Sequence, residues 1–220
     1  MLLSLRDRSV ASFLLAALGL SALALVFLLL ADRAPASAQE SFDFTLAQMA
    51  HAARASHPRL AEIMRDLSGF GSTVGLTLLT VGSCAYLALT RRRRTALVVG
   101  LSILAASLAV QLLKGGFTRL RPDSKLAHFV ETGFSFPSGH ASMSAVVFLT
   151  LGALVARTHG RARERWFIMG LAILMALLVG ASRVALGVHW LSDVLAGWIF
   201  GAAWAAFSLA LARRVEPRPG

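Results

Sequence analysis

The sequence predicts an all-α membrane protein, a single-domain bundle of six transmembrane helices. Of the 220 residues, 56% are hydrophobic and only 15% are charged, which is more apolar than a soluble domain needs. The apolar residues form runs of about 20, the length with which a helix crosses a hydrocarbon core about 30 Å thick. Every second linker between the runs is strongly basic, a pattern typical of chains that cross a membrane repeatedly.

The six expected transmembrane segments cover residues 10–31, 69–90, 95–113, 138–156, 166–186 and 189–212. Four basic clusters, before the first segment and after the second, fourth and sixth, contain 13 of the 22 Lys and Arg residues. Such clusters mark the cytoplasmic side. We therefore expect both termini inside a bacterial plasma membrane, with residues 32–68 and 114–137 outside. The net charge of +11 also suits nucleic acid, but basic residues confined to short clusters favour topology, so no nucleic-acid partner is expected.

The first apolar segment has two interpretations. Basic residues, an apolar stretch and Ala36-Ser37-Ala38 together resemble a signal peptide with its cleavage site. However, an apolar run of 22 residues exceeds the roughly 7–15 residues of a signal-peptide core, which favours a retained helix. Cleavage would leave the orientation of the other five segments unchanged.

The first outer linker, residues 32–68, contains two stretches with apolar residues at helical spacing, separated by Pro58. In each stretch four residues share a helical face: Leu46, Met49, Ala50 and Ala53, then Leu60, Ile63, Met64 and Leu67. We expect two short helices at the membrane surface. They either cover a functional site or shield apolar surface, and the sequence does not distinguish these roles.

Three groups of polar residues stand at the outer ends of the third to sixth expected segments. They are Lys114 with Arg121-Pro122, then Pro137-Ser138-Gly139-His140, then Ser182-Arg183 with His189 and Asp193. Because all four ends lie at one membrane face, the topology predicts that they converge on one pocket. We expect the outer loop of residues 114–137 to be the active-site loop beside it.

Each group also has a structural interpretation. Long basic side chains anchor helices by reaching for the interface, a lone histidine is often only packed, and His189 with Asp193 at i, i+4 makes a polar pair on one helical face. Against this, ionisable groups near the centre of a membrane cost about 2.5–3.5 kcal/mol and by default mark function. Lys114 and Arg121 also lie on the side that basic residues avoid, which indicates an anionic partner.

The pattern Lys114-x6-Arg121-Pro122, Pro137-Ser138-Gly139-His140 and Ser182-Arg183-x5-His189-x3-Asp193 resembles the three-part signature of the type 2 phosphatidic acid phosphatase superfamily. Vanadium haloperoxidases and glucose-6-phosphatase are relatives within it. The resemblance extends over about residues 40–212. It implies an integral membrane lipid phosphatase that works through a phosphohistidine intermediate, with a membrane lipid phosphate as substrate.

The resemblance also implies a role for each matching residue. His189 is the expected nucleophile, Asp193 orients it, and His140 is the general acid and then the base. The expected phosphate ligands are Lys114, Arg121, Ser138, Gly139 and Arg183. These roles agree with the chemistry, since Lys and Arg neutralise phosphate and the start of a helix offers N–H donors. No cofactor and no metal are expected, because the pattern supplies one carboxylate and cations in place of Mg²⁺.

The sequence does not choose the lipid. Undecaprenyl diphosphate is the first expectation, and phosphatidylglycerol phosphate and phosphatidic acid are also compatible. A phosphotransferase or a lipid A phosphatase on the same scaffold is the nearest alternative. An alternative of another class is a membrane transporter without catalysis, although transport sites usually lie near the middle of the membrane. The sequence indicates no oligomeric state.

Overall fold

The computed structural model describes residue 26 and residues 42–215, so the first expected transmembrane segment, residues 10–31, lies outside the described part except for Val26. The described chain is helical and contains no strand, which confirms the all-α prediction. Its helices are α2 (Phe42–Ser56), α3 (Pro58–Gly69), α4 (Thr73–Leu89), α5 (Arg93–Phe117), α6 (Gly139–Ala156), α7 (Ala162–Ala185) and α8 (Leu191–Val215).

Five helical segments of the described part are long and apolar enough to cross a membrane, namely α3 with α4, and α5, α6, α7 and α8. Helices α4 to α8 begin and end within about four residues of the last five segments expected from the sequence, and α3 extends the first of these segments back to Pro58. Local signals explain where they begin: the hydroxyl of Ser72 caps α4 by accepting a hydrogen bond from the N–H of Gly75 at 3.1 Å. Pro58 occupies the first turn of α3, where its missing N–H costs nothing.

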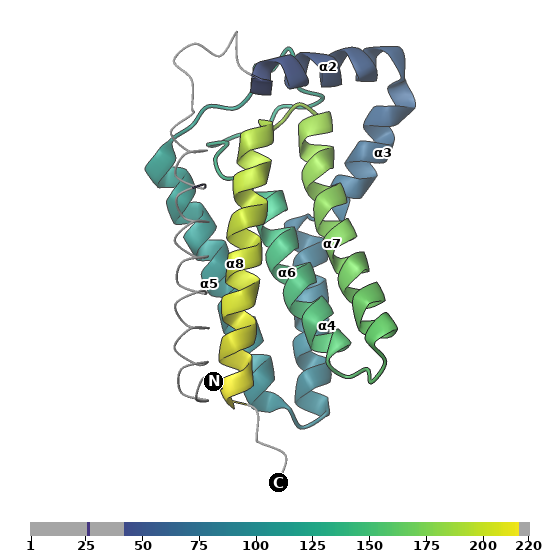
Figure 1. The fold of residues 1–220 in the computed structure, drawn as a ribbon. Helices are drawn as coiled ribbons and strands as arrows, with labels where there is room; N and C mark the ends of the chain where they lie inside the picture. Colours follow the sequence, from purple (N-terminus) through teal and green to yellow (C-terminus); the bar gives the residue numbers. More distant parts are fainter. Residues whose placement is uncertain (1–25, 27–41, 216–220) are drawn as a thin grey trace, which may run out of the picture.

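Helix α6 is the centre of the bundle (Figure 1), with α7 and α8 packed along it. Half of its residues are buried, against a third of the most apolar stretch of α5, α7 or α8. A Cβ at Gly201 of α8 would lie 2.4 Å from the Cβ of Ala145, so only glycine permits this approach of α8 to α6. Large apolar side chains such as Leu78 of α4 and Leu108 and Leu112 of α5 are exposed, as expected for a surface that faces lipid.

The outer linker forms two helices, as its spacing indicates. Helix α2 lies across the ends of α7 and α8, whereas α3 descends beside α7 and leads into α4 (Figure 1). Arg54 of α2 is buried and donates hydrogen bonds to the carbonyls of Ala185 and Leu126, which ties α2 to the end of α7 and to the α5–α6 loop. Helix α2 therefore covers the end of the bundle where the polar motifs lie. Its place at a membrane surface stays a prediction.

Candidate active site

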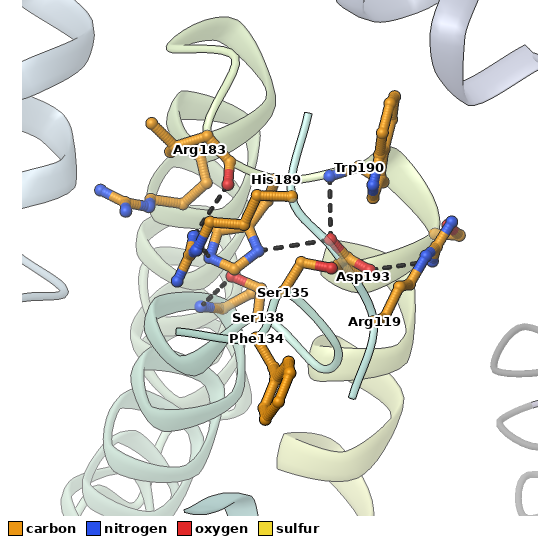
Figure 2. Close-up of polar contacts among 12 residues, drawn as sticks. Arg119, Phe134, Ser135, Ser138, Arg183, His189, Trp190 and Asp193 are labelled. Atoms are coloured by element: carbon orange, nitrogen blue, oxygen red, sulfur yellow. Dashed lines mark hydrogen bonds and ion pairs between the residues drawn. The ribbon is translucent and has the colours of Figure 1, made fainter. Parts of the chain in front are cut away.

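The eight residues singled out from the sequence lie at the same end of the bundle. Lys114 is in the last turn of α5, Arg121 in the α5–α6 loop, and Arg183 in the last turn of α7. The remaining five are at the start of α6 and around the start of α8: Ser138, Gly139, His140, His189 and Asp193. The ends of α5, α6, α7 and α8 and the α5–α6 loop thus build the site, and Figure 2 shows Ser138, Arg183, His189 and Asp193 gathered there.

His189 lies in the short connection between α7 and α8. The turn before it depends on Gly187, whose φ is +70° and whose place would bring a Cβ to 2.3 Å from the carbonyl oxygen of Leu126. The His189 side chain is buried, with Nδ1 3.3 Å from Asp193 Oδ2 and Nε2 3.0 Å from Arg121 Nη1. Since a guanidinium only donates, Nε2 accepts from Arg121, and Nδ1–H donates to Asp193.

The surroundings of His189 favour the neutral ring. Burial, and then the positive charges of Arg121, Arg183 and Lys114, lower the pKa of His189 well below its ordinary value. A neutral imidazole with its proton on Nδ1 has a lone pair on Nε2, directed toward the cations. That is the form in which a histidine acts as a nucleophile.

On the Nδ1 side, Asp193 is fully buried and fully engaged. Its Oδ2 also accepts the N–H of Trp190 at 2.9 Å, and its Oδ1 accepts from Arg119 Nη1 at 2.9 Å (Figure 2). Arg119 in turn donates to Ser192 Oγ at 2.7 Å and to Asp43 Oδ2 of α2 at 3.1 Å. We call Asp193, Arg119, Ser192 and Asp43 the buried carboxylate network; it attaches the covering helix α2 to the partner of His189.

On the Nε2 side stand three cations, Lys114, Arg121 and Arg183, here called the cation cluster. Lys114 Nζ donates to the carbonyl of Phe134 at 2.7 Å. Arg121 donates to the carbonyls of Gly133 at 3.0 Å and Val188 at 2.8 Å. Arg183 is buried and donates to Ser68 Oγ at 2.7 Å. These contacts fix the three side chains on the Nε2 side of His189.

Glu131, which the motif pattern does not include, lies inside the cation cluster. Its Oε2 is 2.7 Å from Arg121 Nη1 and 4.0 Å from His189 Nε2, and its Oε1 pairs with Arg183 Nη2. Burial alone would raise the pKa of the Glu131 carboxyl, but the charges of Arg183 and Arg121 outweigh it and hold the pKa below its usual value. The carboxylate is therefore ionised.

The start of α6 is bonded to the start of α8 through the main chain of Ser138. The N–H of Ser138 donates to the main-chain carbonyl of Asp193 at 3.0 Å, so it is not available to phosphate. The buried hydroxyl of Ser138 accepts from the N–H of Ala141 as a helix cap. Ser138 thus joins α6 to α8 through its main chain, and its role as a phosphate ligand stays a prediction. Gly139 and His140 line the pocket described next.

A groove of about 1260 Å³ opens at the cation cluster and continues between α4 and α5. Its α5 wall extends from Lys114 to Arg93, about 30 Å of helix at about 1.5 Å per residue. Along α4 and α5 its walls are mostly apolar, whereas its upper end is formed by Arg121, His140 and His189. The groove thus joins an elongated apolar channel to a cationic site.

The described residues contain no cluster of three or more His, Cys, Asp or Glu side chains arranged to hold a metal ion. Both carboxylates beside His189 are paired with arginine, Asp193 with Arg119 and Glu131 with Arg121 and Arg183. Metal independence of the reaction stays a prediction.

The family model of the PAP2 superfamily matches residues 95–216. Phosphatidylglycerophosphatase B of Bacillus subtilis is 34% identical over 179 residues, which are 80% of this chain and 86% of that protein. The undecaprenyl-diphosphatase of Sulfolobus acidocaldarius is 32% identical over 122 residues, 53% of this chain and 54% of that one.

A solved structure has the same arrangement of helices. The crystal structure of a transmembrane PAP2-type phosphatidylglycerolphosphate phosphatase from Bacillus subtilis is similar with a TM-score of 0.81 and 29% identity. The match covers 91% of this chain and 98% of that one. The likeness therefore extends over nearly the whole length of both chains.

Proposed function

Because the chain belongs to the PAP2 superfamily of phosphate-ester hydrolases, we propose that it removes phosphate from a membrane lipid through a phosphohistidine on His189. The observation that supports this most is the groove, which joins a long apolar channel to His189, Lys114 and Arg121. A lipid tail fits the channel, and a phosphate with roughly two negative charges fits the cation cluster. A soluble phosphate ester would need no such channel.

In the first step, Arg121 moves from Nε2 to the phosphate, and Nε2 attacks phosphorus. The N–P bond forms as the bond between phosphorus and the lipid oxygen breaks, and a protonated His140 gives its proton to that oxygen. The ring becomes positively charged, and Asp193 stabilises it by accepting the Nδ1–H hydrogen bond. The cation cluster balances the charge that spreads over the phosphoryl oxygens.

In the second step, the now neutral His140 accepts a proton from water, and the hydroxide oxygen attacks phosphorus. The N–P bond breaks, inorganic phosphate leaves, and His189 returns to its neutral form. His140 lines the same groove as His189, Lys114 and Arg121, which supports its use in both proton transfers. A hydroxyl-bearing lipid in place of water would make the protein a phosphotransferase.

For the substrate, the names of the relatives favour two lipids. The protein from Bacillus subtilis is named for phosphatidylglycerol phosphate and matches 80% of this chain, whereas the one named for undecaprenyl diphosphate matches 53%. We therefore propose phosphatidylglycerol phosphate as the first lipid to test, ahead of undecaprenyl diphosphate, which the sequence alone favoured. Phosphatidic acid and lipid A complete the panel.

The test is release of inorganic phosphate by the detergent-purified protein from each of the four lipids, with excess EDTA and without it. We expect release from at least one lipid, unchanged by the chelator. Loss of phosphate from the lipid without free phosphate, in the presence of an acceptor lipid, would identify a phosphotransferase. Binding and movement of a lipid without any phosphate transfer would contradict the enzyme and favour the transporter.

We also propose that the site faces the outside of a bacterial plasma membrane and that both termini are cytoplasmic. The basic clusters at Arg91–Arg94 and beyond α6 support this orientation. In a variant with the single cysteine removed, Cys84→Ser, a cysteine at exposed Ser124 should react with an impermeant maleimide in intact cells, whereas one at exposed Arg92 should not. The reverse labelling would contradict the orientation.

A further inference from the structure

Glu131 occupies the place that a substrate phosphate needs. A phosphorus atom poised for attack must lie about 3–3.5 Å from Nε2 of His189, with its oxygens within reach of the arginines. The carboxylate of Glu131 lies there instead, with Oε2 at 2.7 Å from Arg121 Nη1 and 4.0 Å from His189 Nε2, and Oε1 on Arg183. A carboxylate offers two oxygens and one charge, which makes it a partial imitation of phosphate.

From this position we infer that Glu131 is a specificity-determining residue: an internal competitor that keeps singly charged phosphodiester headgroups out of the site and yields to a doubly charged terminal phosphate. The inference rests on the proposed function, because it concerns the phosphate subsite of that reaction. It assigns Glu131 a role in choosing among lipids rather than in the chemistry.

The charges of the site support such a choice. With Glu131 in place, one negative charge faces the three positive charges of Lys114, Arg121 and Arg183. A terminal phosphate that replaces the carboxylate brings roughly two negative charges and gains over the group it displaces. A phosphodiester brings only one charge, so it exchanges one monoanion for another and gains little. The phosphodiester lipids that make up a bilayer would otherwise compete for the same arginines.

The local structure lets the carboxylate withdraw. Glu131 belongs to a surface segment of the α5–α6 loop, in which Val130 is 77% exposed and Gly133, with φ +82°, has no neighbouring atom within 4 Å of an added Cβ. Arg121 also binds the carbonyl of Gly133 through Nε, and this contact can remain when Nη1 turns to a phosphate. Rotation of the Glu131 side chain alone therefore opens the subsite.

The arginines are also incompletely satisfied by Glu131. Within the described residues, the buried Nε of Arg183 has no hydrogen-bond partner, although Nη1 and Nη2 of the same side chain are engaged. A buried N–H without a partner is costly. A tetrahedral phosphate with more oxygens is a better partner for this cluster than a planar carboxylate, which favours displacement by the correct ligand.

The rival role for Glu131 is to hold Arg121 and Arg183 in place for the substrate. The two roles predict opposite effects of Glu131→Gln, which keeps the shape and removes the charge. A holding residue predicts weaker anion binding in the variant. A competitor predicts tighter binding, with the larger gain for the singly charged ligand. Glu62→Gln is the matched control, since Glu62 is exposed on α3 and the substitution makes the same change in net charge.

The experiment measures the thermal unfolding midpoint of the full chain in detergent, titrated with inorganic phosphate or with dimethyl phosphate, a soluble phosphodiester. For Glu131→Gln we expect the dissociation constant of dimethyl phosphate to fall about tenfold relative to wild type and to Glu62→Gln, as loss of a charge-assisted competitor implies. The dissociation constant of inorganic phosphate should fall less. For Glu131→Asp, whose carboxylate is one methylene further from the arginines, the dissociation constants should lie between those of the wild type and those of Glu131→Gln.

A second readout uses turnover. In mixed micelles, added phosphatidylglycerol should inhibit phosphate release by Glu131→Gln at about tenfold lower concentration than it inhibits the wild type. Unchanged or weaker binding of both anions in Glu131→Gln and Glu131→Asp would overturn the inference, and an equal gain for both anions would overturn its claim of specificity. Absence of phosphate release from every lipid by the wild type would refute the proposed function instead, and the unfolding titrations would still decide the competitor role.

Discussion

The two ring nitrogens of His189 face regions of opposite design. On the Nδ1 side, the buried carboxylate network binds Asp193 through Arg119, Ser192 and the main chain, and Arg119 is only 5% exposed. On the Nε2 side, the cation cluster opens onto the groove, and Glu131, whose side chain is 23% exposed, fills it. The charges of the buried carboxylate network are paired with one another, whereas the cation cluster is partly exposed and accessible to a ligand.

This difference is consistent with the proposed use of the His189 imidazole as a nucleophile. A buried ion pair that loses one partner is strongly destabilised, so the network behind Nδ1 has a single arrangement and keeps the ring in one tautomer and one orientation. In the proposed reaction the cation cluster instead exchanges one anion for another in each turnover, and its partial exposure permits that exchange. Variants on the two sides should therefore differ in which quantity they change, kcat or KM, as well as in the size of the change.

The largest effect is expected where the two regions meet. His189→Ala removes the nucleophile and should lower phosphate release by at least about 10⁴-fold, since the remaining cations stabilise charge but offer no covalent route. The cation cluster remains, so inorganic phosphate should still raise the thermal unfolding midpoint of the variant. Near-normal release by correctly inserted His189→Ala would refute the nucleophile assignment.

On the Nδ1 side, Asp193→Asn should slow formation of the phosphohistidine by about 10³- to 10⁴-fold. The amide keeps the size of the side chain, but it lacks the charge that stabilises the ring after attack. Single-turnover measurement with a lipid labelled in its phosphate separates this step from hydrolysis of the intermediate. A loss of less than about tenfold would assign Asp193 a role in packing only.

Arg119 tests the difference between the two sides of His189, because we expect it to act through Asp193 as a positioning residue. Arg119→Gln should lower kcat by about 10- to 100-fold with little change in KM, whereas Arg121→Gln in the cation cluster should raise KM as well. Loss of Arg119 also leaves Asp193 and Asp43 without their buried cation, which should cost about 3–5 kcal/mol in the free energy of unfolding.

The control for this prediction is Arg119→Lys, which keeps a charge without the planar donor fork and should recover part of the stability and part of kcat. Equal changes in KM for Arg119→Gln and Arg121→Gln would contradict the division into two regions. A structural role alone would change the unfolding free energy of Arg119→Gln and leave its kcat at full occupancy near that of the wild type.

The sequence predicted the helices and the one-turn spacing of His189 and Asp193, because both follow from periodicity along a single element. It missed Arg119, Asp43 and Glu131. These residues lie in linkers or in the first turn of a covering helix, and their partners are distant in the chain: Arg119 binds Asp43 across 76 positions, and Arg183 binds Glu131 across 52. Only tertiary packing brings them together.

One signal for Arg119 was present. It is a basic residue on the side of the membrane that basic residues avoid, two positions before the motif residue Arg121. The sequence also did not predict the main-chain contact of Ser138, since a helix start offers its N–H groups to an anion only when no neighbouring segment has bonded them. Here α8 supplies the carbonyl of Asp193, a contact between elements that no local pattern contains.

The smallest effect concerns pH. Burial and the neighbouring cations lower the pKa of His189 in the folded state, while the unfolded ring titrates near its ordinary value of about 6.5. As pH falls below about 6.5, the unfolded chain takes up a proton that the folded chain does not, so stability is lost by up to about 1.4 kcal/mol per pH unit. Glu131, whose pKa is also lowered, adds a further loss only below about 4.3. Unfolding free energies of wild type and His189→Ala, measured between these limits, should therefore converge as the solution is acidified, and parallel curves would show that burial and the cation cluster do not lower the pKa of His189.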